Sequence, residues 1–197
     1  ELARWGVTHD VYEALDTASL RAALRSSTKL VWVEAPGSVT MEFPDLRGLV
    51  RTVREVAPQA VVALDNTWGA GLAFDAFNLG EGLSVDLTIH ALTKYPSGGG
   101  DVLMGSICVN DRDLHDRLAW THSRLGLGVG ANDVEAVLRS LPTMALRYAA
   151  QDAAARSLAQ SCVTQPAVRH VLHPALPGSP GHDNWAAHCR AAAGIFS

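Results

Sequence analysis

Four short apolar runs rich in β-branched residues constrain the fold of this 197-residue chain more than any other feature. Polar and apolar residues hardly alternate within them, which is typical of strands buried on both faces of a parallel sheet. Between the first two runs, apolar residues at helical spacing predict a helix over 45–57, between Pro44 and Pro58. This strand–helix–strand order predicts an α/β fold with a parallel sheet. The four runs are residues 30–33, 60–64, 87–91 and 102–109.

Apolar spacing and capping residues predict three further helices. The last of them is long and rich in Ala, Leu and Arg, and Pro142 must kink or interrupt it. The three helices cover residues 17–25, 112–124 and about 132–160.

The composition changes between residues 145 and 165, and beyond this region the pattern predicts a strand over 168–172. We therefore expect a domain boundary there and divide the chain into residues 1–150 and 151–197.

Composition and charge exclude several classes of protein. Sixteen basic and 20 acidic side chains give a net charge of −4 without a basic cluster, which argues against a nucleic-acid partner. No stretch approaches the ~20 apolar residues of a membrane span, and no signal-peptide pattern is present, so a cytoplasmic location without a membrane partner is expected. The three cysteines lie too far apart for a zinc ribbon or a CxxC site, and we expect reduced, mostly buried thiols.

Asp65 directly follows the second apolar run and begins the segment Asp65-Asn66-Thr67-Trp68. In a parallel sheet, ligands bind just beyond the carboxyl ends of the strands, so Asp65 is a candidate site residue. An aspartate at a strand end also commonly orders the turn that follows it, and this structural role remains open.

Lys94 is one of only two lysines, and it follows the third apolar run. The glycines at 98–100 behind it leave room for a bulky ligand, although a lysine in such a loop is ordinarily solvated. If the second and third runs are adjacent strands, Asp65 and Lys94 face one pocket. Pyridoxal 5'-phosphate (PLP) sites need this pair, because the lysine forms a Schiff base and the aspartate keeps the pyridine nitrogen protonated.

Four histidines and a cysteine near the end of the chain are the other candidates for chemistry. Their flanking residues favour loop and surface histidines over metal ligands, and no metal site is expected. The glycine-rich segment 126–130 lacks the spacing of a dinucleotide-binding motif. The histidine group comprises His170, His173, His182 and His188, with Cys189.

Several motifs in order show that the chain resembles the Cys/Met-metabolism family of PLP-dependent enzymes, most closely its bacterial cystathionine β-lyase branch. They are Glu-Ala-Pro-Gly-Ser-Val-Thr-Met-Glu at 34–42, Asp-Asn-Thr-Trp at 65–68, Ala-Leu-Thr-Lys-Tyr at 91–95, and the segment 173–197. Members of the family are about twice as long as this chain, so we expect it to be a central part of a longer protein.

The resemblance implies the three-layer, parallel-sheet fold of PLP-dependent transferases (fold type I). Residues 1–150 would be the later part of the large PLP-binding domain, and 151–197 the beginning of a smaller α+β C-terminal domain. Lys94 would form the Schiff base, Asp65 would pair with the pyridine nitrogen, and Thr93 would donate to the cofactor phosphate.

The chain also departs from the family at positions near this site. Ala91 stands where relatives often have a serine that binds the phosphate, and Ser38 stands where many have a pocket asparagine. Trp68 is expected at the edge of the cofactor ring. Relatives often have Gly-His-Ser-Asp where this chain has Gly-Gly-Gly-Asp at 98–101, which puts the geometry on the phosphate side in doubt.

The resemblance implies a carbon–sulfur lyase of trans-sulfuration and methionine metabolism. Its reaction would be β-elimination of L-cystathionine, or a related S-substituted cysteine, to homocysteine, pyruvate and ammonia. The alternative within the family is a cystathionine γ-synthase or γ-lyase, and the alternative from another class is a non-catalytic fragment or pseudoenzyme that contributes an assembly surface. The family also implies a cytoplasmic homotetramer, a dimer of dimers with shared active sites.

Overall fold

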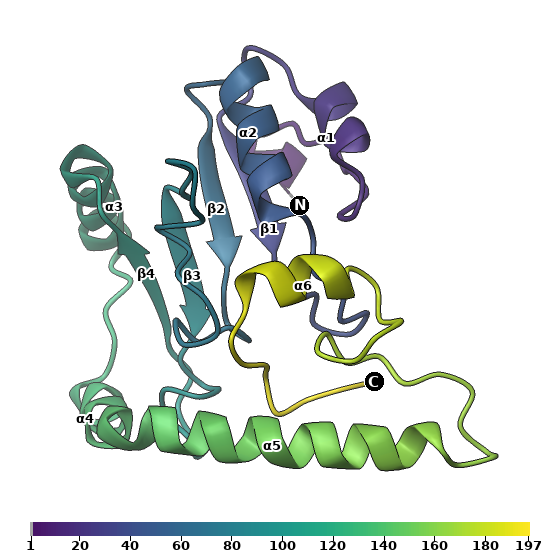
Figure 1. Ribbon diagram of the computed structural model, residues 1–197. Coiled ribbons are helices and arrows are strands. Elements are labelled where there is room, and N and C mark those ends of the chain that lie inside the picture. The colour runs from purple at the N-terminus through teal and green to yellow at the C-terminus, as the bar shows by residue number, and fades with distance from the viewer. Residues whose placement is uncertain (1) are drawn as a thin grey trace.

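A four-stranded mixed sheet organises residues 2–197, which the computed structural model describes. Figure 1 shows α1 and α2 on one side of β1 and β2, and α5 running past the end of the sheet toward which β1, β2 and β3 point. The strands are β1 (Leu30–Glu34), β2 (Val61–Asp65), β3 (Leu87–Ala91) and β4 (Gly105–Val109). The α-helices are α1 (Thr17–Ala23), α2 (Leu46–Val56), α3 (Arg112–Leu125), α4 (Ala131–Ser140), α5 (Met144–Val163) and α6 (His182–His188), and short 3-10 helices cover Leu2–Trp5 and Leu141–Thr143.

The strand order is β1-β2-β3-β4, with β1, β2 and β3 parallel and β4 antiparallel to β3. The α/β fold is therefore confirmed, whereas the expectation that all four strands are parallel is wrong for β4. Parallel neighbours need a crossover connection, usually a helix. Residues 92–104 form turns without a helix, so the chain returns beside β3 in the opposite direction.

Helix α2 covers one face of the sheet. It begins at the capping residue Asp45, whose carboxylate accepts a hydrogen bond from Gly48 N at 2.9 Å. Its buried side chains join those of β1 and β2 in one hydrophobic core. The core residues of α2 are Leu46, Leu49, Val50 and Val53.

The prediction that the strands are buried on both faces of the sheet is wrong for β1 and β4. On β1, Val31 and Val33 are buried, while the alternate residues Leu30 and Trp32 are 52% and 50% exposed. On β4, Ile107 is 51% exposed. Their β-branched and aromatic side chains fit a pleated strand whether one face or both are covered, so composition alone did not distinguish the two cases.

The helical predictions are confirmed, and the long C-terminal pattern is interrupted at Pro142 as expected, giving α4, a 3-10 turn and α5. The strand expected over 168–172 is wrong, because this segment is irregular in the structure. Its backbone pairing is with the end of the chain, where Leu172 and Ser197 exchange two N–H···O=C hydrogen bonds of 2.6 and 3.0 Å. Helix α5 passes through residue 150 without a break, and the division of the chain there stays a prediction.

Candidate functional site

Two carboxylates lie in one row at the carboxyl end of the parallel strands. Glu34, the last residue of β1, is the register partner of Asp65, the last residue of β2, and Asp65 is in turn the partner of Ile89 on β3. In Figure 1 this end of the sheet faces the half of the molecule that contains α5 and α6. The sheet therefore presents acidic side chains at the edge where α/β proteins bind ligands.

Asp65 orders the turn that follows β2, as its structural interpretation predicted. Its Oδ1 accepts hydrogen bonds from Thr67 N at 3.0 Å and from Thr67 Oγ1 at 2.6 Å. Both bonds use the same oxygen, and within residues 2–197 the other oxygen, Oδ2, makes none. The half-buried carboxylate thus holds its turn and keeps one acceptor for a ligand.

Hydrogen bonds connect the turn after β2 to the turn that carries Lys94. The Thr67 hydroxyl, which donates to Asp65, also accepts from Ala91 N at 3.0 Å. The carbonyl of Ala91 then accepts from Lys94 N at 3.2 Å. The structure therefore brings the predicted residues Asp65 and Lys94 into one connected group, with the Lys94 side chain exposed.

Helix α5 stabilises the turn that carries Lys94 through hydrogen bonds from Arg147. Arg147 donates from Nη1 to the Tyr95 carbonyl at 2.8 Å and from Nη2 to the Ser140 hydroxyl at 2.8 Å. Gly98 has a left-handed φ of +73°, and a Cβ at this position would lie 2.6 Å from Arg147 Nη1. The turn therefore favours glycine at 98 for its left-handed backbone, and a larger residue there would also displace the end of the Arg147 side chain.

Trp68 lies beside the Lys94 amine. Lys94 Nζ is 5.7 Å from the centroid of the Trp68 ring, within the range of a cation–π contact. The indole Nε1–H donates to Ser38 Oγ at 3.2 Å, and the Ser38 hydroxyl donates to Glu34 Oε1. Sequence reasoning named Ser38 and Trp68 as pocket candidates but missed Glu34, although Glu34 ends a predicted strand just as Asp65 does.

His90 is a second residue that sequence reasoning missed. It is half-buried on β3, with Nε2 3.2 Å from Thr88 Oγ1. Burial lowers the pKa of its imidazole, and the negative charge of Asp65 and a backbone contact with Asn66 act in the opposite direction.

Thr93, the third predicted site residue, is half-buried in the same turn as Lys94. Its carbonyl accepts a hydrogen bond from Ser97 Oγ at 3.0 Å, which tightens the turn. No hydrogen bond of the Thr93 hydroxyl occurs among the described residues, so this group is available to a ligand.

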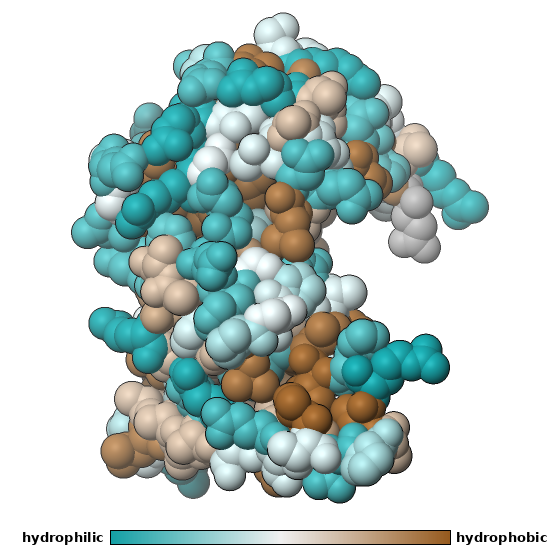
Figure 2. Space-filling model, turned by 45° about the vertical axis from the view of Figure 1, so that its right-hand side comes forward, coloured by the Kyte–Doolittle hydropathy of each residue, from teal (hydrophilic) through white to brown (hydrophobic). Residues whose placement is uncertain are grey.

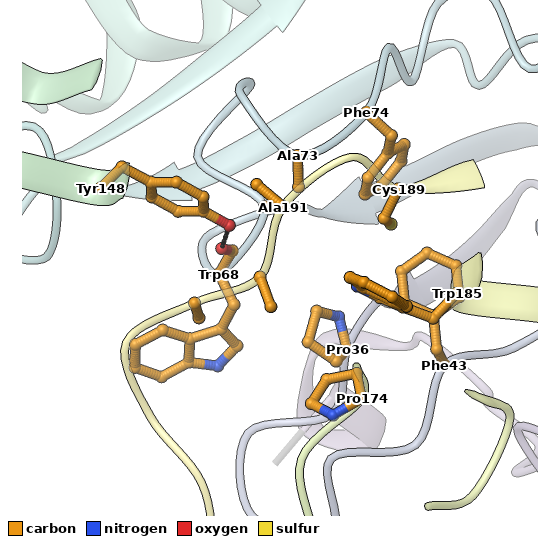
Figure 3. A pocket seen from close by; sticks show the side chains of 13 residues that line it. Pro36, Phe43, Trp68, Ala73, Phe74, Tyr148, Pro174, Trp185, Cys189 and Ala191 are labelled. Atoms are coloured by element: carbon orange, nitrogen blue, oxygen red, sulfur yellow. Dashed lines mark hydrogen bonds between the residues drawn. The ribbon is translucent and has the colours of Figure 1, made fainter. Parts of the chain in front are cut away.

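A small apolar cavity, whose lining includes Trp68 but not Lys94 or Asp65, lies between the loop after β2 and the C-terminal segments (Figure 3). Tyr148 of α5 closes one side by donating to the Trp68 carbonyl at 2.8 Å, and Phe43 meets Phe74 edge to face at 5.6 Å between centroids. Its lining contains no Asp, Glu, Lys, Arg or His, so it serves packing more than chemistry. Figure 2 shows hydrophobic side chains gathered around a hollow in the lower half of the molecular face that it presents. The cavity lining comprises Pro36, Phe43, Trp68, Gly69, Ala73, Phe74, Tyr148, Pro174, Trp185, Cys189, Ala191, Ala192 and Ala193.

The remaining cysteines and histidines are dispersed. Cys108 is exposed and Cys162 and Cys189 are partly buried, so the expectation of mostly buried thiols is wrong for Cys108. Burial raises the pKa of the Cys189 thiol to about 12. His173 is fully buried, and its Nδ1 accepts from Ala175 N at 3.1 Å. Nowhere in residues 2–197 do three His, Cys, Asp or Glu side chains group as metal ligands.

The architecture is that of an α/β enzyme domain with a polar site at the carboxyl ends of its parallel strands. The chain belongs to the family of Cys/Met metabolism PLP-dependent enzymes, whose family model matches residues 1–197. The resemblance drawn from its motifs is therefore confirmed, and PLP is the cofactor of this family. None of the helices in the described part of the chain is long and apolar enough to span a membrane.

Individual relatives lie in more than one branch of the family. The chain is 35% identical over 196 residues to cystathionine beta-lyase MetC of Escherichia coli (strain K12), covering 100% of this chain and 48% of that protein. It is 34% identical over 168 residues to cystathionine gamma-synthase of the same organism, covering 85% and 42%. A crystal structure of metB from Corynebacterium glutamicum matches with a TM-score of 0.92 and 26% identity, covering 99% of this chain and 49% of that one. The chain thus spans about half the length of the curated relatives it matches.

Proposed function

We propose that this chain carries the lysine-bearing part of the active site of a PLP-dependent carbon–sulfur lyase that cleaves L-cystathionine by β-elimination. The products are homocysteine, pyruvate and ammonia. The observation that carries the proposal is the hydrogen-bonded connection from Asp65 through Thr67 and Ala91 to Lys94, at the carboxyl ends of two parallel strands.

The side chains at this edge fit PLP. Lys94 offers an exposed primary amine for a covalent bond to an aldehyde. Asp65 offers Oδ2 as an acceptor for a protonated pyridine nitrogen, and Thr93 offers a hydroxyl for a phosphate. When bound, PLP supplies an electron sink for the negative charge that develops at the substrate α-carbon.

The protein's own residues then hold and move protons. Lys94 Nζ removes the proton from the substrate α-carbon as a general base. The negative charge of Asp65 favours a proton on the ring nitrogen, because an opposite charge at short range stabilises the charged form. Thr67 keeps that carboxylate oriented by donating a hydrogen bond to Oδ1.

The proposal extends to the whole protein. We assign residues 1–150 to the large cofactor domain and 151–197 to the beginning of a smaller one. The active protein is proposed to be a cytoplasmic homo-oligomer, a dimer of dimers with shared sites, that acts on a small amino-acid substrate.

A γ-specific enzyme of the same family is the second candidate. The observation that favours it is the 34% identity to a cystathionine gamma-synthase, close to the 35% identity to a cystathionine beta-lyase. Product analysis separates the candidates, because β-cleavage of cystathionine gives pyruvate and homocysteine, whereas γ-cleavage gives 2-oxobutyrate and cysteine.

The two lysines provide a matched test. We expect Lys94→Ala to abolish pyruvate release from L-cystathionine and Lys29→Ala to retain it, since Lys29 precedes β1 at the opposite end of the strand from Glu34. After borohydride reduction of the parental protein, the cofactor mass should remain on the peptide that contains Lys94. Parental pyruvate release by Lys94→Ala would overturn the proposal. A colourless protein that takes up no PLP would favour the non-catalytic alternative.

A further inference from the structure

Trp68 is held by hydrogen bonds at two points, its backbone carbonyl and its indole N–H. Its carbonyl accepts from the buried Tyr148 hydroxyl at 2.8 Å, a bond visible in Figure 3. Its Nε1–H donates to Ser38 Oγ at 3.2 Å. In Figure 3 the indole extends away from Tyr148, so the two anchors act on opposite ends of the residue.

Glu34 determines the direction of the hydrogen bond between Ser38 and Trp68. An ionised carboxylate only accepts hydrogen bonds, so the single Ser38 hydroxyl proton is donated to Glu34 Oε1. The lone pairs of Ser38 Oγ are then left to accept from the indole N–H. A charged acceptor strengthens such a chain, because the polarised hydroxyl is a better acceptor for the next donor.

The indole that this chain orients is the one beneath the Lys94 amine. Nζ lies 5.7 Å from the ring centroid, and Trp is the aromatic side chain that attracts a cation most strongly. The ring face attracts the ammonium form and offers no lone pair that would compete for its proton. The ring face therefore suits a lysine that must hold a proton and later release it, because it stabilises the ammonium form without accepting the proton.

We propose that Trp68 is a positioning residue for Lys94, whose ammonium form rests on the indole face, and that Ser38 and Glu34 set the orientation of that indole. This inference rests on the proposed role of Lys94 as the proton-transferring amine. It assigns a joint function to Glu34 at the end of β1 and to Ser38, Trp68 and Lys94 on the loops after β1, β2 and β3.

The test measures the chemical reactivity of Lys94 directly. Cofactor-free protein is acylated at neutral pH with a substoichiometric amount of an amine-reactive reagent. Peptide mass spectrometry then gives the ratio of labelled Lys94 to labelled Lys29. Trp68→Leu removes the ring face, and Trp32→Leu is the matched control, because Trp32 is a half-exposed tryptophan on β1. We expect Trp68→Leu to raise the ratio about two- to fivefold, which is the factor that corresponds to the free energy of an exposed cation–π contact. Trp32→Leu should leave the ratio unchanged.

Variants at Ser38 test the orienting chain without altering the ring. Ser38→Ala should raise the ratio in the same direction as Trp68→Leu, and Ser38→Thr, which keeps a hydroxyl, should restore the parental value. An unchanged ratio in Trp68→Leu, or an equal rise in Trp32→Leu, would overturn the proposal. So would a rise in Ser38→Ala that Ser38→Thr fails to reverse. The labelling needs no turnover, so it separates failure of this inference from failure of the lyase assignment, which the Lys94→Ala assay decides.

Discussion

Asp65 and Thr67 form a closed turn in which one carboxylate oxygen accepts both the backbone N–H and the hydroxyl of the threonine, at 3.0 and 2.6 Å. The same hydroxyl accepts from Ala91 N, so it lies between the ends of β2 and β3. A turn of this kind has a structural role and a chemical role at once. It orders the backbone with Oδ1 and leaves Oδ2 for a ligand.

Thr67→Val should lower the free energy of unfolding by about 1–3 kcal/mol, because it keeps the shape of a buried side chain but leaves the Ala91 N–H without its acceptor. Urea unfolding followed by circular dichroism measures the change. Thr121→Val is the control, since Thr121 makes its hydroxyl bond on the exposed surface of α3 and should cost no more than about 0.5 kcal/mol. Equal effects of the two variants would argue against a bridging role for Thr67.

Asp65→Asn should separate the two roles of the carboxylate. An amide oxygen can still accept from Thr67, so the stability of the fold should be nearly retained, whereas the negative charge is lost. We expect kcat for pyruvate release to fall by about 10²-fold or more, the scale for removing one electrostatic partner from a preorganised site.

Asp75→Asn is the matched control for Asp65→Asn, because Asp75 makes the same kind of turn, accepting from Phe77 N at 2.9 Å, but is exposed and does not belong to a strand. Full activity in Asp65→Asn would remove the charge of Asp65 from the proposed mechanism. Loss of activity in both variants would indicate that replacing the aspartate of such a turn disturbs the structure, and would contradict a specific role for the charge of Asp65.

His173 should make the stability of the protein depend on pH below neutrality. Burial lowers the pKa of its ring, the positive charge of Arg156 lowers it further, and Asp152 opposes them. The unfolded chain takes up a proton near pH 6.5, and the folded chain does so only at lower pH. The unfolded state therefore binds more protons in this range, so stability is complete above about pH 6.5 and falls as the pH decreases.

Urea unfolding at pH 7.5 and 5.5 tests this dependence. His173→Asn keeps an acceptor for Ala175 N but cannot titrate, so the loss of stability between the two pH values should be smaller than in the parental protein. Burial also lowers the pKa of His90 and His188, so part of the loss should persist. His122→Asn, on the exposed surface of α3, is the control. A loss as large in His173→Asn as in the parent would contradict the prediction.

Strand positions and candidate residues were accessible from sequence because they depend on local patterns. The predictions for β1, β2 and β3 agree with the structure to within a residue or two, and Asp65 ends β2 while Lys94 closely follows β3. The direction of β4 was not accessible from its own residues. It depends on the connection before it, which returns without a helix.

Glu34 and His90 were missed because their importance comes from neighbours that are distant in the sequence. Glu34 meets the site only through the register of β1 with β2 and through the path of the loop that carries Ser38. The strand expected over 168–172 failed for a related reason. A strand exists only where a partner pairs along its length, and Leu172 pairs there with a single residue at the end of the chain.

The sequence by itself determined the α/β class, the family and two chemical groups: a carboxylate at the end of one strand and an amine just beyond the end of the neighbouring strand. Short-range patterns of apolar and turn residues are enough for this, because the carboxyl ends of adjacent parallel strands must meet at one edge of the sheet. Only the tertiary structure decided what surrounds the Lys94 amine. The meeting of Lys94 with Trp68, and of Trp68 with Ser38 and Glu34, depends on strand register and loop paths. These result from packing across the whole chain rather than from any local pattern.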